Sequence, residues 1–150
     1  MKHFLYILLA LTLAGTVASC TYNNGDIGIW FGTWSIDTLK VDGNVTHLAT
    51  AGDTAVNYFM QFQSSVFRLS IVGPYHDADE NFGTWQEGEQ PGTMRAWFPD
   101  SNYTYILHRV PGMELDNHFT VVRHNNRRLV LTKTAANGHT YTYCISKNAQ

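Results

Sequence analysis

The stretch GIWFGTWSIDTLKVDG, residues 28–43, has the alternating pattern of a long β-strand. Side chains two positions apart lie on the same face of an extended chain. One face is apolar and the other polar: the first carries Trp30, Gly32, Trp34 and Ile36, and the second carries Thr33, Ser35 and Asp37. A glycine between two tryptophans is typical of a strand that bends, as closure of a sheet into a barrel requires. We therefore predict a first strand that bends at Gly32.

Segments with the same two-residue period follow, and their connectors are short and rich in Gly, Pro or Asn. The predicted strands cover residues 58–62, 67–71, 82–85, 94–98, 103–108, 118–123, 128–134 and 140–146. The pattern of residues 45–53 is compatible with a loop, a short helix or a weak strand. Residues 75–81 are predicted to be a loop. The letters FGTW of residues 31–34 recur at residues 82–85. No segment has a convincing helical period.

About eight strands joined directly to their neighbours predict an all-β, antiparallel, up-and-down eight-stranded β-barrel. Closure removes the exposed edges of such a sheet, and eight strands enclose a space that side chains fill or that holds one small ligand. A two-sheet β-sandwich is the alternative.

The N-terminus predicts export. A short basic start precedes an apolar run over residues 4–14, which is too short for a membrane span and typical of a signal peptide. Residues 17–20, VASC, resemble a bacterial lipobox, in which the signal is removed before the Cys and the thiol carries lipid. The resemblance implies a signal peptide over residues 1–19, a lipidated tether over 20–27 and a barrel domain over 28–147. An ordinary secretory signal that leaves Cys20 as a thiol is the alternative.

Lipidation at Cys20 would make the membrane a partner of this protein and place it in the bacterial cell envelope. Residues 21–25 carry no acidic side chain, which favours the periplasmic face of the outer membrane over the cell surface. The net charge of −2 offers no electrostatic footprint for nucleic acid. Cys144 is expected to be a small buried hydrophobe.

The motif Gly32-Thr33-Trp34 near the start of a long strand, followed by hairpins, resembles the small lipocalin-like domains of bacterial lipoproteins. The resemblance implies that Trp34 closes the base of the barrel and that the interior binds a small hydrophobic ligand. Lipocalins often stack an Arg of the last strand over this Trp, whereas here that strand offers only Lys147. Either one of Arg123, Arg127 and Arg128 stacks on Trp34 by a cation–π contact, or the partner is absent.

Aromatic and apolar side chains on the predicted inward faces are the candidate cavity lining. Inward phenols need hydrogen-bond partners or water, so many of them suggest a partly polar cavity. A filled core whose hydroxyls reach the rims explains them equally well. The candidates are Tyr58, Met60, Phe62, Phe67, Leu69, Met94, Phe98, Tyr103, Tyr105, Tyr141 and Tyr143.

Signals for metal binding and catalysis are weak. Asp77, Asp79 and Asn81 have the spacing of the first calcium ligands of an EF-hand, but Phe82 and Gly88 stand where that loop needs Gly and Glu. No catalytic or cofactor motif occurs, so we expect neither an enzyme nor a bound cofactor. The triplets at Thr38 and Thr54 resemble a bacterial O-glycosylation signal, which leaves modification there open.

Two functions remain. The first is a lipid-anchored binding protein that holds a small apolar or amphipathic ligand in its barrel. The second is a structural or interaction lipoprotein whose barrel is filled by side chains and whose rim loops dock an envelope protein.

Overall fold

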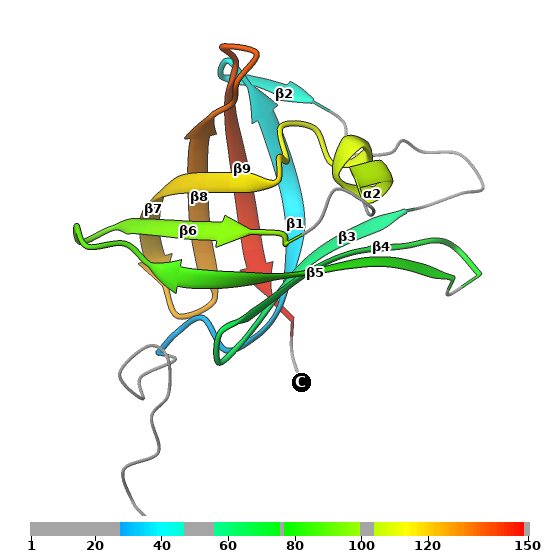
Figure 1. Ribbon diagram of the computed structural model, residues 1–150, viewed down its shortest axis with the longest axis horizontal. Coiled ribbons are helices and arrows are strands. Elements are labelled where there is room, and N and C mark those ends of the chain that lie inside the picture. Colours follow the sequence, from blue (N-terminus) through cyan, green and yellow to red (C-terminus); the bar gives the residue numbers. More distant parts are fainter. Residues whose placement is uncertain (1–27, 47–55, 76, 100–103, 149–150) are drawn as a thin grey trace, which may run out of the picture.

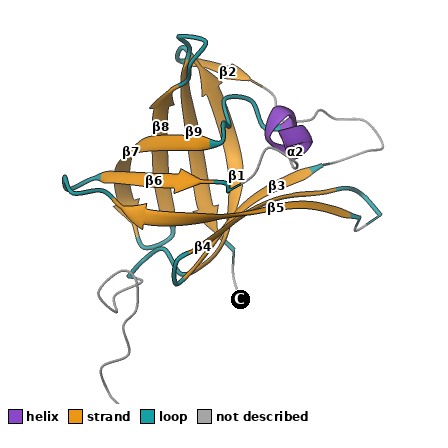
Figure 2. Ribbon diagram, in the orientation of Figure 1, coloured by secondary structure: helices purple, strands orange, loops and turns teal. Residues whose placement is uncertain are grey.

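The computed structural model describes residues 28–46, 56–75, 77–99 and 104–148 (Figure 1). They form strands and a single short helix in this part of the chain, as Figure 2 shows by colour. The strands are β1 (Gly32–Val41), β2 (Asn44–Thr46), β3 (Asn57–Gln63), β4 (Val66–Val72), β5 (Ala78–Glu87), β6 (Thr93–Trp97), β7 (Asp116–Asn125), β8 (Arg128–Thr134) and β9 (Thr140–Lys147). The helix is α2 (Thr104–Arg109).

The sheet closes into a barrel. From β3 to β9 each strand pairs antiparallel with the next, and β1 pairs with β3 on one side and with β9 on the other. The β1–β9 seam runs from the pair Trp34–Lys147 to the pair Val41–Tyr141. Eight strands thus form the ring, while β2 is a short hairpin partner of β1. The predicted eight-stranded antiparallel barrel is confirmed, and the two-sheet sandwich is not formed.

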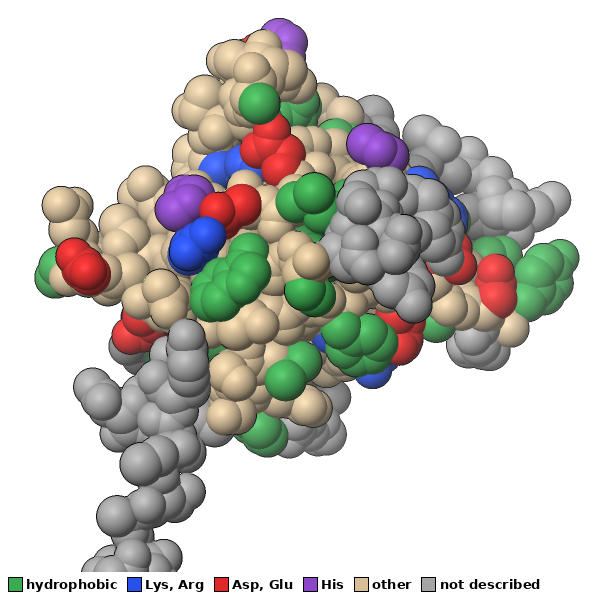
Figure 3. All heavy atoms as spheres, viewed as in Figure 1, with side chains coloured by type: hydrophobic (Ala, Val, Ile, Leu, Met, Phe, Trp, Pro, Cys, Tyr) green, Lys and Arg blue, Asp and Glu red, His purple; other side chains and the backbone are tan. Residues whose placement is uncertain are grey.

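Alternation along the strands fills the barrel interior with large side chains. The repeated FGTW tetrapeptide shows this in both copies, since Trp34 and Trp85 are 0% exposed while Phe31 and Phe82 are 48% and 54% exposed. Trp85 packs edge-on against Phe62, with ring centroids 5.3 Å apart. On the face shown in Figure 3, hydrophobic side chains lie in separate groups among polar and charged ones.

Two backbone irregularities bend β1. Gly32 has φ = 117°, a conformation that L side chains rarely adopt and glycine adopts readily. The register of β1 against β9 then shifts between Ile36 and Thr38, which makes Asp37 the extra residue of a β-bulge. Bulges and glycines increase local twist and bending, so both devices help β1 curve around the barrel.

The prediction of a strand over residues 103–108 is wrong. Residues 104–109 form α2, and Ile106 and Leu107 are buried. The ring is complete without this segment because β6 pairs directly with β7, from Thr93–Thr120 to Trp97–Asp116. The connection between them is therefore free to coil over one end of the barrel.

Two smaller expectations also change. The loop predicted over residues 75–81 is shorter, because β5 begins at Ala78 and pairs with β4 from that residue onward. Cys144 is free and only partly buried, since it lies between the inward residues Tyr143 and Ile145 of β9. None of the helical residues described here forms a segment long and apolar enough to cross a membrane.

Candidate functional site

Among the described residues, the ladder between β1 and β3 stops partway along β1. The ladder of β1 with β3 covers Gly32 to Ser35, and the ladder of β1 with β2 covers Leu39 to Val41. Within the described residues, the intervening part of β1 has a ladder partner on its β9 side alone. The Asp37 bulge lies in this part, and a bulge disrupts pairing locally.

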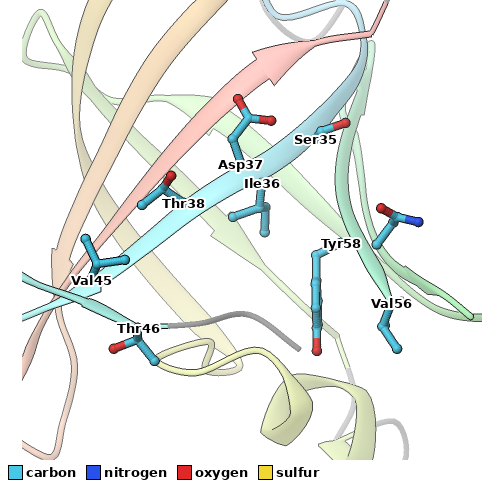
Figure 4. A pocket seen from close by; sticks show the side chains of 9 residues that line it. Ser35, Ile36, Asp37, Thr38, Val45, Thr46, Val56 and Tyr58 are labelled. Atoms are coloured by element: carbon cyan, nitrogen blue, oxygen red, sulfur yellow. The ribbon is translucent and has the colours of Figure 1, made fainter. Parts of the chain in front are cut away.

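A pocket of about 520 Å³ lies beside the middle part of β1 (Figure 4). This volume is within the range of sites for small molecules, roughly 300–1,000 Å³. We call it the wall pocket, and it is lined by Ser35, Ile36, Asp37, Thr38, Val45, Thr46, Val56, Asn57 and Tyr58.

The wall pocket has an apolar inner side and a polar outer side. Ile36 is buried, and Val56 and Tyr58 are partly buried against the core. Figure 4 shows these three side chains extending to one side of β1 and β3, and Asp37 extending to the other. Asp37 is exposed, and its Oδ1 accepts a hydrogen bond from Ser146 Oγ at 3.0 Å. A molecule with an apolar part and a polar part fits this arrangement.

The structure gathers most of the candidate lining residues into a packed interior. Tyr58 lies at the wall pocket, Tyr103 lies outside the described residues, and Tyr105 belongs to α2. A side chain with no accessible surface borders no space that admits a water molecule, and Met60, Phe62, Phe67, Leu69 and Tyr143 are 0% exposed. The remaining candidates, Met94, Phe98 and Tyr141, are 2–7% exposed.

Two of the phenols, for which a polar cavity and a filled core were both left open, have hydrogen-bond partners within the protein. Tyr143 donates its hydroxyl hydrogen bond to the Pro111 carbonyl at 2.7 Å, and burial raises the pKa of this phenol. Tyr141 accepts a hydrogen bond from Asn137 Nδ2 at 2.9 Å. Both hydroxyls therefore have protein partners at the end of the barrel near α2.

The cation over Trp34 is a lysine. Lys147 Nζ lies 5.4 Å from the centroid of the Trp34 ring, so the expectation that an arginine or no residue would stack there is wrong. The register explains this contact, because Trp34 and Lys147 are paired across the β1–β9 seam.

The acidic candidates for a metal site are spread along β5. Asp77 precedes the strand and is exposed, Asn81 is buried, and Asp79 forms an ion pair with Arg109 of α2. The described residues contain no group of three or more His, Cys, Asp or Glu side chains that could hold a metal ion.

The modification candidates are divided between described and undescribed parts of the chain. Cys20 and Thr54 lie outside the described residues. Thr38 lies on the outward side of β1, at the edge of the wall pocket.

The wall pocket was not predicted from the sequence. Its lining comes from the middle of β1, from β2 and from the start of β3, which are neighbours because β2 and β3 both pair with β1. The apolar positions shift phase from Trp34 and Ile36 to Leu39 and Val41, and this break in alternation is the local signal that could have marked the bulge.

Comparisons with known proteins support the fold. No family model matches the chain, and no curated protein matches it in sequence. Among solved structures, a lipocalin-like protein from Bacteroides uniformis superposes with a TM-score of 0.57 at 16% identity, over 81% of this chain and 100% of that one. A protein from Bacteroides eggerthii, described as uncharacterized, superposes with a TM-score of 0.56 at 14% identity, over 79% and 99% of the two chains.

These likenesses concern the fold, which is that of a lipocalin-like barrel. The predicted resemblance to lipocalin-like domains is confirmed at that level.

Proposed function

We propose that this chain is a non-enzymatic binding protein that takes a small amphipathic ligand at the wall pocket. The observation that carries the proposal is the β1–β3 ladder, which ends at Ser35 and is followed by a pocket of about 520 Å³. The apolar part of the ligand lies against Ile36, Val56 and Tyr58, and its polar part lies near Asp37. The filled interior favours this position over the centre of the barrel.

The proposal includes a lipid anchor in the bacterial envelope. The lipobox-like residues 17–20 support acylation of Cys20, and each buried methylene of the acyl chains contributes about 0.8 kcal/mol to membrane binding. We infer a position at the periplasmic face of the outer membrane. Radiolabelled palmitate should enter the wild-type chain and not Cys20→Ser, and equal labelling of both would refute the anchor.

Ligand binding is tested on acyl-free Cys20→Ser protein purified from its native host. Native mass spectrometry should detect a co-purifying small molecule, and a dodecyl-chain alcohol or a bile acid should raise the melting temperature. Tyr58→Ala removes the ring from the wall pocket and should abolish the shift. Tyr75→Ala, at a tyrosine that is 86% exposed, is the control and should keep it. Protein that carries no ligand and is stabilised by neither compound would refute the proposal.

The filled interior also supports the second function, docking of an envelope protein through the rim. Cross-linking in cells should then trap one partner reproducibly. Removal of residues 75–81 would cut into β5, so Tyr75→Ser at the β4–β5 connection is the cleaner variant. It should abolish the cross-link without changing the melting temperature, and a cross-link that persists would argue against docking at this connection.

A further inference from the structure

One end of the barrel is covered by α2 and the residues that follow it. We call residues 104–115 the cap, which Figure 1 shows crossing from α2 to the start of β7. Its buried side chains are Ile106, Leu107, Val110 and Met113. Polar contacts also attach it to the strands, among them the Arg109–Asp79 ion pair and the hydrogen bond from Tyr143 to Pro111.

A buried lysine of the barrel wall lies beneath the cap. Lys133 shares the inward face of β8 with Leu129 and Leu131, and its side chain is 2% exposed. Its Nζ donates hydrogen bonds to Asn117 Oδ1 at 2.7 Å and to Glu114 Oε2 at 2.6 Å. Asn117 is neutral, so Glu114 supplies the negative charge in direct contact with this ammonium group.

The Glu114 carboxylate is held by two donors that belong to the barrel. Lys133 Nζ contacts Oε2, and the backbone N–H of Ala136, in the connection after β8, donates to Oε1 at 2.8 Å. An ammonium and a backbone N–H aimed at the two oxygens of one carboxylate form a carboxylate-binding site. The carboxylate that occupies it comes from the cap.

The positive charge of Lys133 makes this site favour an acidic occupant. A buried ammonium that loses its partner is strongly destabilising, and the Lys133 side chain is 2% exposed while that of Glu114 is 33% exposed. Burial lowers the pKa of Lys133, and the contacts with Glu114 offset that effect only in part. Movement of Glu114 away from Lys133 would therefore favour any other carboxylate that can take its place.

An approach to the site exists on the surface. A cleft of about 340 Å³ lies between the cap and the β8–β9 connection, and Glu114 forms part of its wall. Apolar residues of the cap and of the connection also belong to this wall, among them Leu107, Met113 and Ala135, which are 2–7% exposed. The cleft is lined by Ala136 and by Glu114, behind which the buried Lys133 lies, and it shares no lining residue with the wall pocket.

We propose that Glu114 holds the place of a ligand carboxylate, and that this end of the barrel binds an apolar carboxylic acid whose head group replaces Glu114 on Lys133 and Ala136. The apolar part of the ligand lies in the cleft beside the cap. Glu114 competes with the ligand, so the wild-type protein binds such acids weakly and a variant without the Glu114 charge binds them more tightly.

Calorimetry with dodecanoate tests the proposal on Cys20→Ser protein. Glu114→Gln keeps the shape of the side chain and removes its charge, and should tighten dodecanoate binding about tenfold or more because Lys133 then lacks a counter-charge. Dodecan-1-ol, with the same chain and no charge, should bind both proteins with similar affinity. The double variant Glu114→Gln with Lys133→Met should lose the gain in dodecanoate affinity.

Glu80→Gln is the matched control, because it removes the carboxylate of the Arg68–Glu80 ion pair on another part of the barrel and should leave dodecanoate binding unchanged. Near-ultraviolet circular dichroism checks that each variant is folded. If Lys133→Met does not fold, the proposal is still tested by comparing the affinities of dodecanoate and dodecan-1-ol for Glu114→Gln. Unchanged dodecanoate affinity in Glu114→Gln, or an equal gain for the alcohol, would overturn the proposal. Tyr58→Ala should leave the gain in affinity from Glu114→Gln intact, which separates this site from the wall pocket.

Discussion

Lys147 lies over the ring of Trp34, with Nζ 5.4 Å from the ring centroid, where the last strand of the barrel meets the first. The same ammonium group donates a hydrogen bond to the Ile29 carbonyl at 3.1 Å, and Trp34 Nε1 donates to the Trp30 carbonyl at 2.8 Å. These contacts join the segment before β1, the start of β1 and the end of β9. The seam that closes the barrel is thus tied at this end by side chains as well as by the ladder.

Replacement of Trp34 by alanine should destabilise the protein by about 3–5 kcal/mol, because the ring is 0% exposed and its loss leaves a cavity. Chemical denaturation measures the change in the free energy of unfolding. Trp97→Ala, at a partly exposed tryptophan, is the control and should cost less. A loss below about 1 kcal/mol at Trp34 would show that this ring does not support the base of the barrel.

Replacement of Lys147 by methionine should cost about 0.5–2 kcal/mol, because it keeps the aliphatic stem but removes both the charge over Trp34 and the hydrogen bond to the Ile29 carbonyl. Lys147→Arg keeps a cation able to lie over the ring and should recover most of this stability. Chemical denaturation of both variants under the same conditions measures the two changes in the free energy of unfolding. Equal stability of Lys147→Met and the wild type would show that the cation–π contact contributes nothing measurable.

Gly112 and Gly43 form a matched pair of sites for testing how closely the cap packs. Both have positive φ, 82° and 83°, so an alanine is strained by about 1–2 kcal/mol at either site. A Cβ at Gly112 would lie 2.3 Å from Tyr141 Cγ, whereas a Cβ at Gly43 would meet nothing within 4 Å. Gly112→Ala should therefore cost about 1–3 kcal/mol more than Gly43→Ala in thermal or chemical unfolding. Equal losses of stability in the two variants would mean that the cap shifts at this contact with little cost in free energy.

The contacts of Glu114 predict a loss of stability in acid. Burial alone would raise the pKa of Glu114, but hydrogen bonds from Lys133 and the Ala136 N–H, together with the charge of Lys133, hold it below its ordinary value of 4.5. A carboxyl whose pKa is lowered by folding stabilises the protein above its unfolded-state pKa, and that contribution is lost as the pH falls through the folded-state pKa.

The free energy of unfolding should therefore decline below about pH 4.5, and less steeply in Glu114→Gln. Asp42 and Asp116 also have lowered pKa values, the first through the backbone N–H of Thr140 and the second through Arg95, so the variant should remove only part of the decline. Denaturation curves from pH 3 to pH 7 measure the two slopes. Identical slopes would contradict the inferred role of Glu114.

Much of the barrel could be predicted from local patterns. Alternation in residues 32–36 places Trp34 and Ile36 inside, because successive side chains of a strand point to opposite faces. Gly, Pro and Asn mark the connections, and direct connections between successive strands predict the antiparallel order. Closure follows, since β1 and β9 would otherwise be open edges.

The cap could not be predicted in this way. Residues 104–109 carry aromatic and branched side chains that suit a strand, yet they form a helix because β6 and β7 pair with each other and leave no place in the ring for another strand. Tertiary context overrides a weak local preference in so short a segment.

The sequence by itself determined the barrel class, the direction of most side chains and the position of Trp34, because strand periodicity and turn chemistry act over a few residues. Tertiary structure alone decided the two candidate sites. The wall pocket exists because the β1–β3 ladder ends at the pair Ser35–Phe59, and the Lys133–Glu114 contact exists because the cap folds over β8. The first joins residues of three strands that pair through β1, and the second joins residues 19 positions apart across the β7–β8 hairpin, so each depends on strand pairing and not on the pattern of one segment.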